Sequence, residues 1–231
     1  MAKEGTAAAR KQARSATPGR RGTGQARHDE IVQIAGRLFA ERGFLATTIR
    51  DIADAASILS GSLYHHFASK ESIADELLSA YWAQLMDRYE AVVASDADAT
   101  EKLRQLIGAS IQMLEAHEYA VRMILNDWSY LSSVLPYCDA NMARIRTIWV
   151  EVLRDGVRDG HFDASLDPQV GYRTIMGSIS GAGRWFVPSG ALTTEQLATQ
   201  MSDLFLGGVS AKRSRPSHVA GRRLTRRPSP G

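Results

Sequence analysis

One short stretch brings together several side chains that could make specific polar contacts. It reads Ser60-Gly61-Ser62-Leu63-Tyr64-His65-His66-Phe67. The phenol of Tyr64 and the imidazole of His65 can donate hydrogen bonds to phosphate oxygens, and their rings can pack on a sugar or a thymine methyl group. The alternative for Tyr64 and His66 is packing within the protein. Because neighbouring residues of a helix point to different faces, we do not expect His65 and His66 to share a metal ion.

Two short helices joined by a tight turn are predicted to position this stretch. Thr48 is a candidate N-cap, and Asp51 suits the first turn of the helix that follows. The apolar face of that helix recurs at helical spacing and consists of Ile49, Ile52, Ala53 and Ala56. A second helix is predicted over Gly61–Phe67. The pair forms a helix-turn-helix, whose second helix enters the major groove of DNA with its N-terminal end, here Ser60, Gly61 and Ser62, against the base edges.

These motifs resemble the DNA-binding domain of TetR-type bacterial transcription repressors, and the match covers Ile31 to Glu71. The segments that carry it are Phe39-Ala40-Glu41-Arg42-Gly43-Phe44, Thr47-Thr48-Ile49-Arg50-Asp51-Ile52-Ala53, the stretch from Gly61 to Phe67, and Ser69-Lys70-Glu71. The resemblance implies an all-α fold, a homodimer on a palindromic operator, and a small-molecule effector that releases the DNA. It also implies that Thr48, Tyr64, His65 and Lys70 clamp the DNA backbone, whereas Leu63 and Phe67 point inward.

A narrower resemblance concerns Ile58 to Phe67. This segment is most similar to the actinobacterial repressors of steroid-ring catabolism, which implies a CoA thioester as effector. Two positions depart from the family pattern: Ser57 replaces a turn glycine, and Leu59 replaces the usual N-cap serine. A residue other than glycine at positive φ costs about 1 kcal/mol. Because leucine cannot cap a helix, we expect Ser60 to cap the second helix one residue later.

The charge of the chain is concentrated at its ends. The net charge is +3; residues 1–27 carry seven Lys or Arg and one Glu (+6), and residues 212–231 carry seven Lys or Arg and no acid (+7), so the part between them carries −10. We predict that both ends are disordered basic segments. The basic arm before the helix-turn-helix is a candidate for DNA contact, the alternative being a solvated tail.

The composition limits the class of protein. The single cysteine, Cys138, permits no internal disulfide and fits a reducing cytosol. No apolar run is long enough for a transmembrane helix, and the N-terminus lacks the apolar core of a signal peptide. We therefore expect a cytoplasmic protein.

Nine helices and no strand are predicted, in two domains: a DNA-binding domain over residues 28–71 and a ligand-binding and dimerisation domain over residues 72–211. The first helix is expected over His28–Arg42, with Gly43 as its stop. The later helices are expected over Ser69 to about Val93, Glu101–His117, Glu118 to about Leu135, Cys138–Asp159, Asp167–Val187, and Thr193 or Thr194 to Leu206, where Gly207-Gly208 stops the last helix. The long helix after Ser69 is the candidate lever between the two domains.

Methionine and aromatic side chains in the middle helices suit either an ordinary core or a large apolar ligand pocket. The resemblance favours the pocket. The candidate ligand-binding residues are Met113, Met123, Asn126, Trp149, Arg184 and Trp185. Arg184 is the only charged residue between Thr174 and Val187, so it calls for an anionic ligand group, a salt bridge or solvent.

A face of small residues at i, i+4 spacing lets two helices approach closely. Gly177, Ser178, Gly181 and Ala182 form such a face, and the family's last two helices make a four-helix dimer bundle. We therefore predict dimerisation through these residues and Leu204.

No catalytic, metal or cofactor motif is present. Gly177-Ser178-Ile179-Ser180-Gly181 has isoleucine where a nucleophile elbow has serine, and the zinc-protease, P-loop and dinucleotide motifs are missing. We predict a regulator that is not an enzyme. The alternatives left open are a ligand-independent or activating regulator of the same fold, a helical acyl-CoA-binding module or enzyme, and general nucleic-acid binding through the basic ends.

Overall fold

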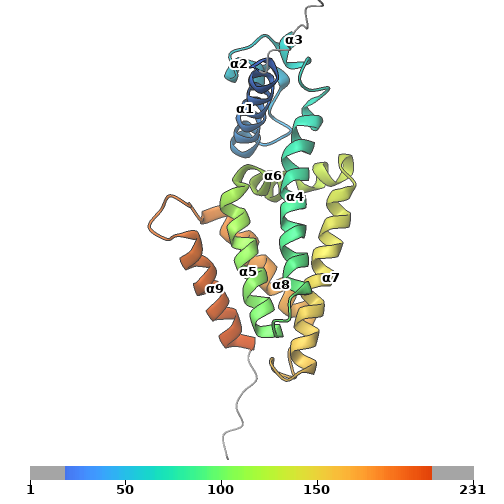
Figure 1. Ribbon diagram of the computed structural model, residues 1–231, viewed down its shortest axis with the longest axis vertical. Coiled ribbons are helices and arrows are strands. Elements are labelled where there is room, and N and C mark those ends of the chain that lie inside the picture. Colours follow the sequence, from blue (N-terminus) through green and yellow to red (C-terminus); the bar gives the residue numbers. More distant parts are fainter. Residues whose placement is uncertain (1–18, 210–231) are drawn as a thin grey trace, which may run out of the picture.

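The computed structural model describes residues 19–209, which form nine helices and no strand (Figure 1). The helices are α1 (Gly19–Arg42), α2 (Ile49–Ala55), α3 (Ser60–Leu63), α4 (Lys70–Ala94), α5 (Ala99–Ala116), α6 (Glu118–Val134), α7 (Tyr137–Arg158), α8 (Pro168–Trp185) and α9 (Thr194–Val209). The predicted all-α, nine-helix fold is confirmed. None of these helices is both long and apolar enough to cross a membrane.

The first helix starts earlier than predicted. We expected disorder up to Arg27, but α1 begins at Gly19. Three hydrogen bonds stabilise this part of the helix: Gln25 donates to Asp29 at 2.8 Å, and the Arg27 guanidinium donates to Glu30 and to the carbonyl of Ala56, which caps the end of α2. The rest of the predicted disordered ends, residues 1–18 and 212–231, lies outside the described residues.

The end of α1 and the start of α2 follow the prediction. Gly43 takes φ 88° directly after α1. The Thr48 hydroxyl accepts from the Asp51 amide at 3.1 Å, and the Asp51 carboxylate accepts from the Thr48 amide at 2.8 Å, which completes a capping box.

The second helix of the helix-turn-helix differs from the prediction. Ser57 takes φ 55°, the left-handed conformation expected for the position of the missing glycine. The helix α3 begins at Ser60 with Leu59 as its N-cap and no side-chain cap, so the prediction that Ser60 caps it was wrong. Its carbonyls at Ser62 and Leu63 accept from amides three residues on, which tightens the chain into turns and ends the α-helix at Leu63 rather than Phe67.

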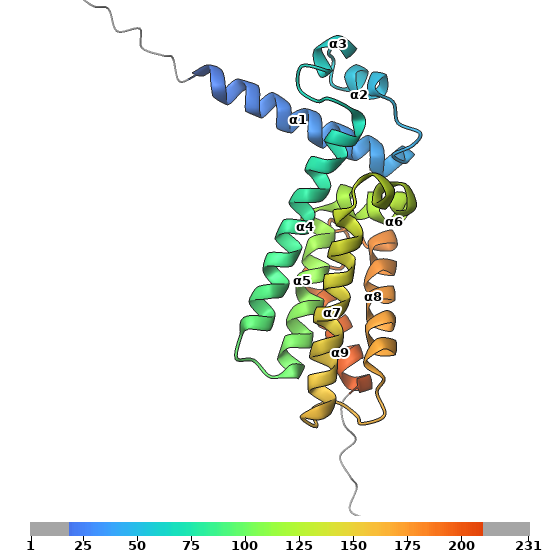
Figure 2. The same cartoon turned by 90° about the vertical axis from the view of Figure 1, so that its right-hand side faces the viewer.

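The remaining helices form a bundle below the DNA-binding domain (Figure 2). The helix α4 runs from α1–α3 down into the bundle, and its start is capped by Ser69 and Ser72. The helix α6 lies across the top of the bundle against α1. The helix α9 packs on α5 and continues through Gly207 and Gly208, where we predicted its stop, because the Val209 carbonyl accepts from the Asp163 amide at 2.8 Å.

Candidate DNA-binding surface and ligand cavity

The helix α3 and the turn after it divide cleanly into buried and exposed side chains. Leu63 and Phe67 are buried, as predicted, and hold the segment against α1. Gly61, Tyr64 and His65 are exposed, and 57% of Tyr64 is accessible. Ser60 and Ser62 are half-buried beside them. Five predicted DNA contacts therefore share one surface segment, with donors that can reach phosphates and base edges.

Thr48 and Lys70, the two flanking candidates, are already engaged within the protein. The Thr48 hydroxyl bonds the Asp51 carboxylate at 2.6 Å, and these bonds from Thr48 lower the pKa of Asp51. Lys70 donates to the carbonyls of Phe44 and Thr47 at 2.8 and 2.9 Å, with its ammonium 4.4 Å from the centre of the Phe44 ring. Lys70 thus ties the α1–α2 loop to α4, which leaves one ammonium proton for a phosphate.

Sequence reasoning missed two apolar side chains on this domain. Leu59 is 79% exposed and Leu45 is 62% exposed. Leu59 directly precedes α3, where a side chain can meet a base edge or a thymine methyl group. Its signal in the sequence was a leucine at a position where the family has a capping serine.

Two histidines of this domain, His28 and His66, lie near other aromatic rings. His28 stacks on Phe67 at 4.4 Å between ring centres and bonds Glu76 at 2.7 Å. The ring of His66 is 6.1 Å from that of His28. Across the described residues, no group of three or more His, Cys, Asp or Glu side chains could hold a metal ion.

The two domains meet at a set of contacts around the end of α1. The Phe44 amide donates to the Asp127 carboxylate at 3.0 Å, and the Phe44 ring lies 5.4 Å from that of Tyr130. Asp127 sits at a kink in α6, with φ −121° and ψ 22°. The Tyr130 hydroxyl donates to Glu71 at 3.1 Å, which raises the pKa of Tyr130. We call Phe44, Asp127, Tyr130 and Glu71 the interdomain contact.

An apolar cavity of about 90 Å³ lies inside the bundle. It is lined by α4, α5, α6, α7 and α8, with no charged side chain; the lining residues are Tyr81, Trp82, Leu85, Tyr89, Ser110, Leu114, Val121, Ile124, Leu125, Met142, Ile145, Met176, Ile179 and Ser180. The hydroxyls of Tyr89 and Ser110 bond each other at 2.6 Å. Burial raises the pKa of Tyr89 to about 12, so its phenol is neutral at physiological pH.

None of the six predicted ligand-binding residues lines this cavity. Met113, Met123 and Trp149 are buried in the core around it, and Asn126 is exposed. Arg184 is exposed and donates to the Leu125 carbonyl at 3.2 Å, while Trp185 is 60% exposed at the end of α8. Residue type predicted a Met- and aromatic-rich interior, but not which turn of each helix faces the space.

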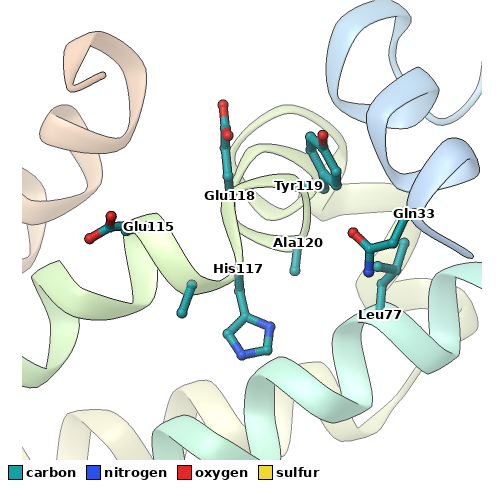
Figure 3. Close-up of a pocket in the computed structure, with 8 residues that line it drawn as sticks. Gln33, Leu77, Glu115, His117, Glu118, Tyr119 and Ala120 are labelled. Atoms are coloured by element: carbon teal, nitrogen blue, oxygen red, sulfur yellow. The ribbon is translucent and has the colours of Figure 1, made fainter. Parts of the chain in front are cut away.

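A second pocket, of about 220 Å³, lies where α1, α4 and the α5–α6 junction meet (Figure 3). His117 ends α5 and precedes α6, and its ring lies 5.9 Å from that of Tyr81, which lines the apolar cavity. Burial lowers the pKa of His117, and Arg88 lowers it further. Gln33 of α1 and Leu77 of α4 face the same space (Figure 3).

Three of the five predicted dimerisation residues are exposed. Gly177, Ser178 and Leu204 are exposed, and a Cβ atom added at Gly177 or Gly181 meets nothing within 4 Å. Leu204 is 72% exposed. The prediction that Ala182 contributes to the dimer interface was wrong, because this residue is fully buried within its own protomer. Its place one residue beyond Gly181 turns it from the exposed face into the core.

Comparison with known proteins identifies both parts of the chain. Residues 31–77 match the model of bacterial regulatory proteins of the tetR family, and residues 96–209 match a Tetracyclin repressor-like C-terminal domain. The HTH-type transcriptional repressor KstR2 of Mycobacterium tuberculosis is 41% identical over 186 residues, which cover 80% of this chain and 93% of that protein.

Solved structures agree with these matches. The ketosteroid transcriptional regulator KstR2 of Mycobacterium tuberculosis superposes with a TM-score of 0.78 at 40% identity, covering 80% of this chain and 96% of the other. AibR in complex with isovaleryl coenzyme A and operator DNA superposes with a TM-score of 0.67 at 26% identity, covering 77% and 97%.

Proposed function

The chain belongs to the TetR family of bacterial regulatory proteins and is a TetR-type transcriptional repressor, and we propose that a CoA thioester from steroid catabolism releases it from its operator. In this proposal it acts in the cytoplasm as a homodimer on a palindromic site. Two copies of the helix-turn-helix then read half-sites one helical turn, or a multiple, apart.

The observation that carries the DNA-binding part is the division of the α3 segment. Leu63 and Phe67 fix it to the core, and Gly61, Tyr64 and His65 face outward. In the proposed complex, Tyr64 and His65 donate to phosphates, and Ser60, Gly61 and Ser62 lie against base edges. Thr48 and Lys70 contact the DNA backbone in this complex. They do so with the hydrogen-bonding capacity that their bonds within the protein do not use.

The size of the apolar cavity supports a mechanism of release. Its volume of about 90 Å³ is smaller than the roughly 300–1,000 Å³ of ordinary ligand pockets. A ring-bearing acyl group therefore fits only if the walls move apart. Such a ligand binds the expanded conformer better than the closed one, and that difference shifts the equilibrium.

Two helices are placed to transmit the movement to the DNA-binding domain. The helix α4 lines the cavity with Tyr81 and Trp82 and begins against α1. The helix α6 lines it with Ile124 and Leu125 and reaches the Phe44 amide through Asp127. To change operator occupancy from about 99:1 to 1:99, the effector needs roughly 5.5 kcal/mol of differential affinity.

Two relatives support the effector class. AibR was crystallised with isovaleryl coenzyme A and operator DNA, and KstR2 is described as a ketosteroid regulator. Arg184 and Trp185, both exposed at the end of α8, remain candidates for contact with the effector outside the cavity.

The test is a footprint of the full chain on DNA from around its own gene, with and without a panel of acyl-CoA thioesters. A protected palindrome that one thioester releases supports the whole proposal. Protection that no thioester disturbs removes the CoA effector and favours a ligand-independent regulator. Salt-sensitive coating without a discrete footprint contradicts specific operator binding.

A further inference from the structure

The apolar cavity can hold only part of a CoA thioester. Its lining contains no charged side chain, whereas CoA ends in a nucleotide with a 3′-phosphate and a diphosphate. Burying such charges without partners is strongly unfavourable. If the acyl group occupies the cavity, the nucleotide must lie on a surface that supplies positive charge. The inference that follows therefore rests on the proposed function.

A groove of about 440 Å³ between α7 and α8 supplies that charge. Arg146 and Arg154 line it from α7 and Arg173 lines it from α8, with Glu151 as its one acidic residue. We call it the arginine groove. All three arginines are exposed, and none forms an ion pair with a carboxylate in the part of the chain that the structure describes.

Neighbouring arginines are paired with carboxylates, and another pocket of the bundle has more acidic than basic residues in its lining. Arg144, also on α7, bonds Glu90 at 2.7 Å, and Arg158 bonds Asp155 and Asp159 at 2.6 and 2.9 Å. The pocket between α5 and α7 sets two basic residues against four acidic ones: Lys102 and Arg158 against Asp98, Glu151, Asp155 and Asp159. Only an excess of unpaired guanidinium groups, as in the arginine groove, favours a phosphorylated ligand.

The arginine groove adjoins the apolar cavity through the same two helices. Arg146 follows Ile145, and Arg173 precedes Met176 by about one turn; Ile145 and Met176 both line the cavity. Burial raises the pKa of Tyr172 on α8, and the charge of Arg146 on α7 partly offsets that rise. The Arg146 charge therefore acts across the gap between the two helices. A ligand that reaches this groove from the cavity must leave between α7 and α8, where these side chains come next along both helices.

We propose that the arginine groove binds the phosphates of the nucleotide end of a CoA thioester whose acyl group occupies the apolar cavity. Guanidinium groups bind phosphate oxygens with paired, charge-assisted hydrogen bonds, and their delocalised charge is weakly hydrated. The Gln169 side chain adds a neutral donor at the same groove. Arg173 lies four residues before Gly177, so the groove borders the face proposed for dimerisation.

The direct test uses adenosine 3′,5′-bisphosphate, the nucleotide end of CoA, titrated into the full chain by calorimetry. We expect saturable binding that the double variant Arg146→Met/Arg173→Met weakens by about tenfold or more. Arg144→Met, on the same helix but paired with Glu90, is the matched control and should bind like the unsubstituted chain. Helical content and dimer mass are measured for each variant, so that misfolding is not mistaken for loss of the site.

Two results overturn the arginine groove as the nucleotide site. One is the absence of saturable binding to the unsubstituted chain at millimolar probe. The other is unchanged binding by the double variant, in particular if Arg184→Met removes binding instead, because the anion then lies at the end of α8.

A second measurement separates this inference from the proposed function. Operator release is titrated with an acyl-CoA and with the same acyl group on pantetheine, which lacks the nucleotide. The arginine groove predicts that acyl-CoA acts at a lower concentration, and that the double variant loses this advantage while its response to acyl-pantetheine is unchanged. If no thioester releases DNA but the nucleotide still binds at the groove, the proposed effector fails and the anion site stands.

Discussion

The Phe44 amide donates a hydrogen bond to the Asp127 carboxylate at 3.0 Å, across the junction between the two domains. The acceptor lies at the one residue of α6 with a non-helical backbone, and its neighbour Tyr130 packs against the ring of Phe44. The kink thus turns a side chain of the effector-binding domain toward the backbone of the DNA-binding domain. This contact makes α6 a second route, beside α4, by which the cavity can influence the helix-turn-helix.

Asp127→Ala should reduce the coupling between effector and operator. The substitution leaves the Phe44 amide without its acceptor, an effect worth roughly 1–3 kcal/mol. We expect the ratio of operator Kd values with and without effector to shrink by about tenfold, measured by fluorescence anisotropy. Asp127→Asn retains an acceptor oxygen and is the control. Equal ratios for all three proteins would show that the hydrogen bond plays no part in coupling.

Tyr64→Phe should weaken operator binding by about tenfold, because it removes one hydrogen bond to the phosphate backbone. The loss should be similar for operators of different sequence, since phosphate contacts carry no base information. His66→Gln, which changes an exposed neighbour outside the proposed contacts, should bind normally. Gel-shift titrations at one fixed salt concentration measure both, and a loss confined to one operator sequence contradicts a phosphate contact.

Ser57→Gly should stabilise the protein. The φ of 55° at Ser57 costs about 1–2 kcal/mol for a residue with a Cβ, whereas glycine adds about 0.5–1 kcal/mol of backbone entropy cost. We expect a net gain of roughly 0.5–1 kcal/mol in the free energy of unfolding, measured by urea denaturation. Ser95→Gly, after α4 in an extended conformation with φ −74°, should bring no such gain.

Leu204→Glu should shift the protein from dimer to monomer at micromolar concentration. Leu204 is 72% exposed on α9, and a second copy that covers this residue would bury the new carboxylate. Sedimentation velocity measures the change. Leu45→Glu, at an exposed leucine of the DNA-binding domain, is the control and should remain dimeric. A dimer that survives Leu204→Glu places the interface elsewhere.

His117 should make stability fall at acidic pH. Burial lowers its pKa in the folded protein below the ordinary 6.5, so the unfolded chain binds the proton more readily. The contribution of His117 is therefore fully present above about pH 6.5 and is lost as the pH falls through the folded-state pKa. His117→Gln should flatten this part of the profile of urea midpoint against pH. An NMR titration that gives His117 a pKa above 6.5 would contradict the sign.

Patterns that depend on neighbours along the chain were predictable from the sequence. The caps at Thr48 and Ser69, the αL residue Gly43 and the strained Ser57 all follow from local backbone chemistry. No signal in the sequence marked the first part of α1, where one stabilising contact joins Arg27 to the carbonyl of Ala56, 29 residues away. Local chemistry could not reveal that partner.

The candidate sites also differ in whether local sequence could predict them. Five of the predicted DNA contacts share one surface segment because they lie close together in the sequence, between Ser60 and His65. The cavity lining was missed because it takes one or two turns from each of five helices, and their rotation is set by packing. Met113 and Trp149 have the right chemistry but face the core, and the methyl group of Ala182, one residue after Gly181, is buried.

The division of the α3 segment has an evolutionary consequence. Two side chains, Leu63 and Phe67, anchor the segment, while its outward side chains contribute little to the packed core. Substitutions at Leu59 or Gly61, which lie where base edges are read, can therefore alter the preferred DNA sequence at little cost in folding. A duplicated gene of this kind could acquire a new set of target promoters through a few outward changes, while its effector response is inherited intact.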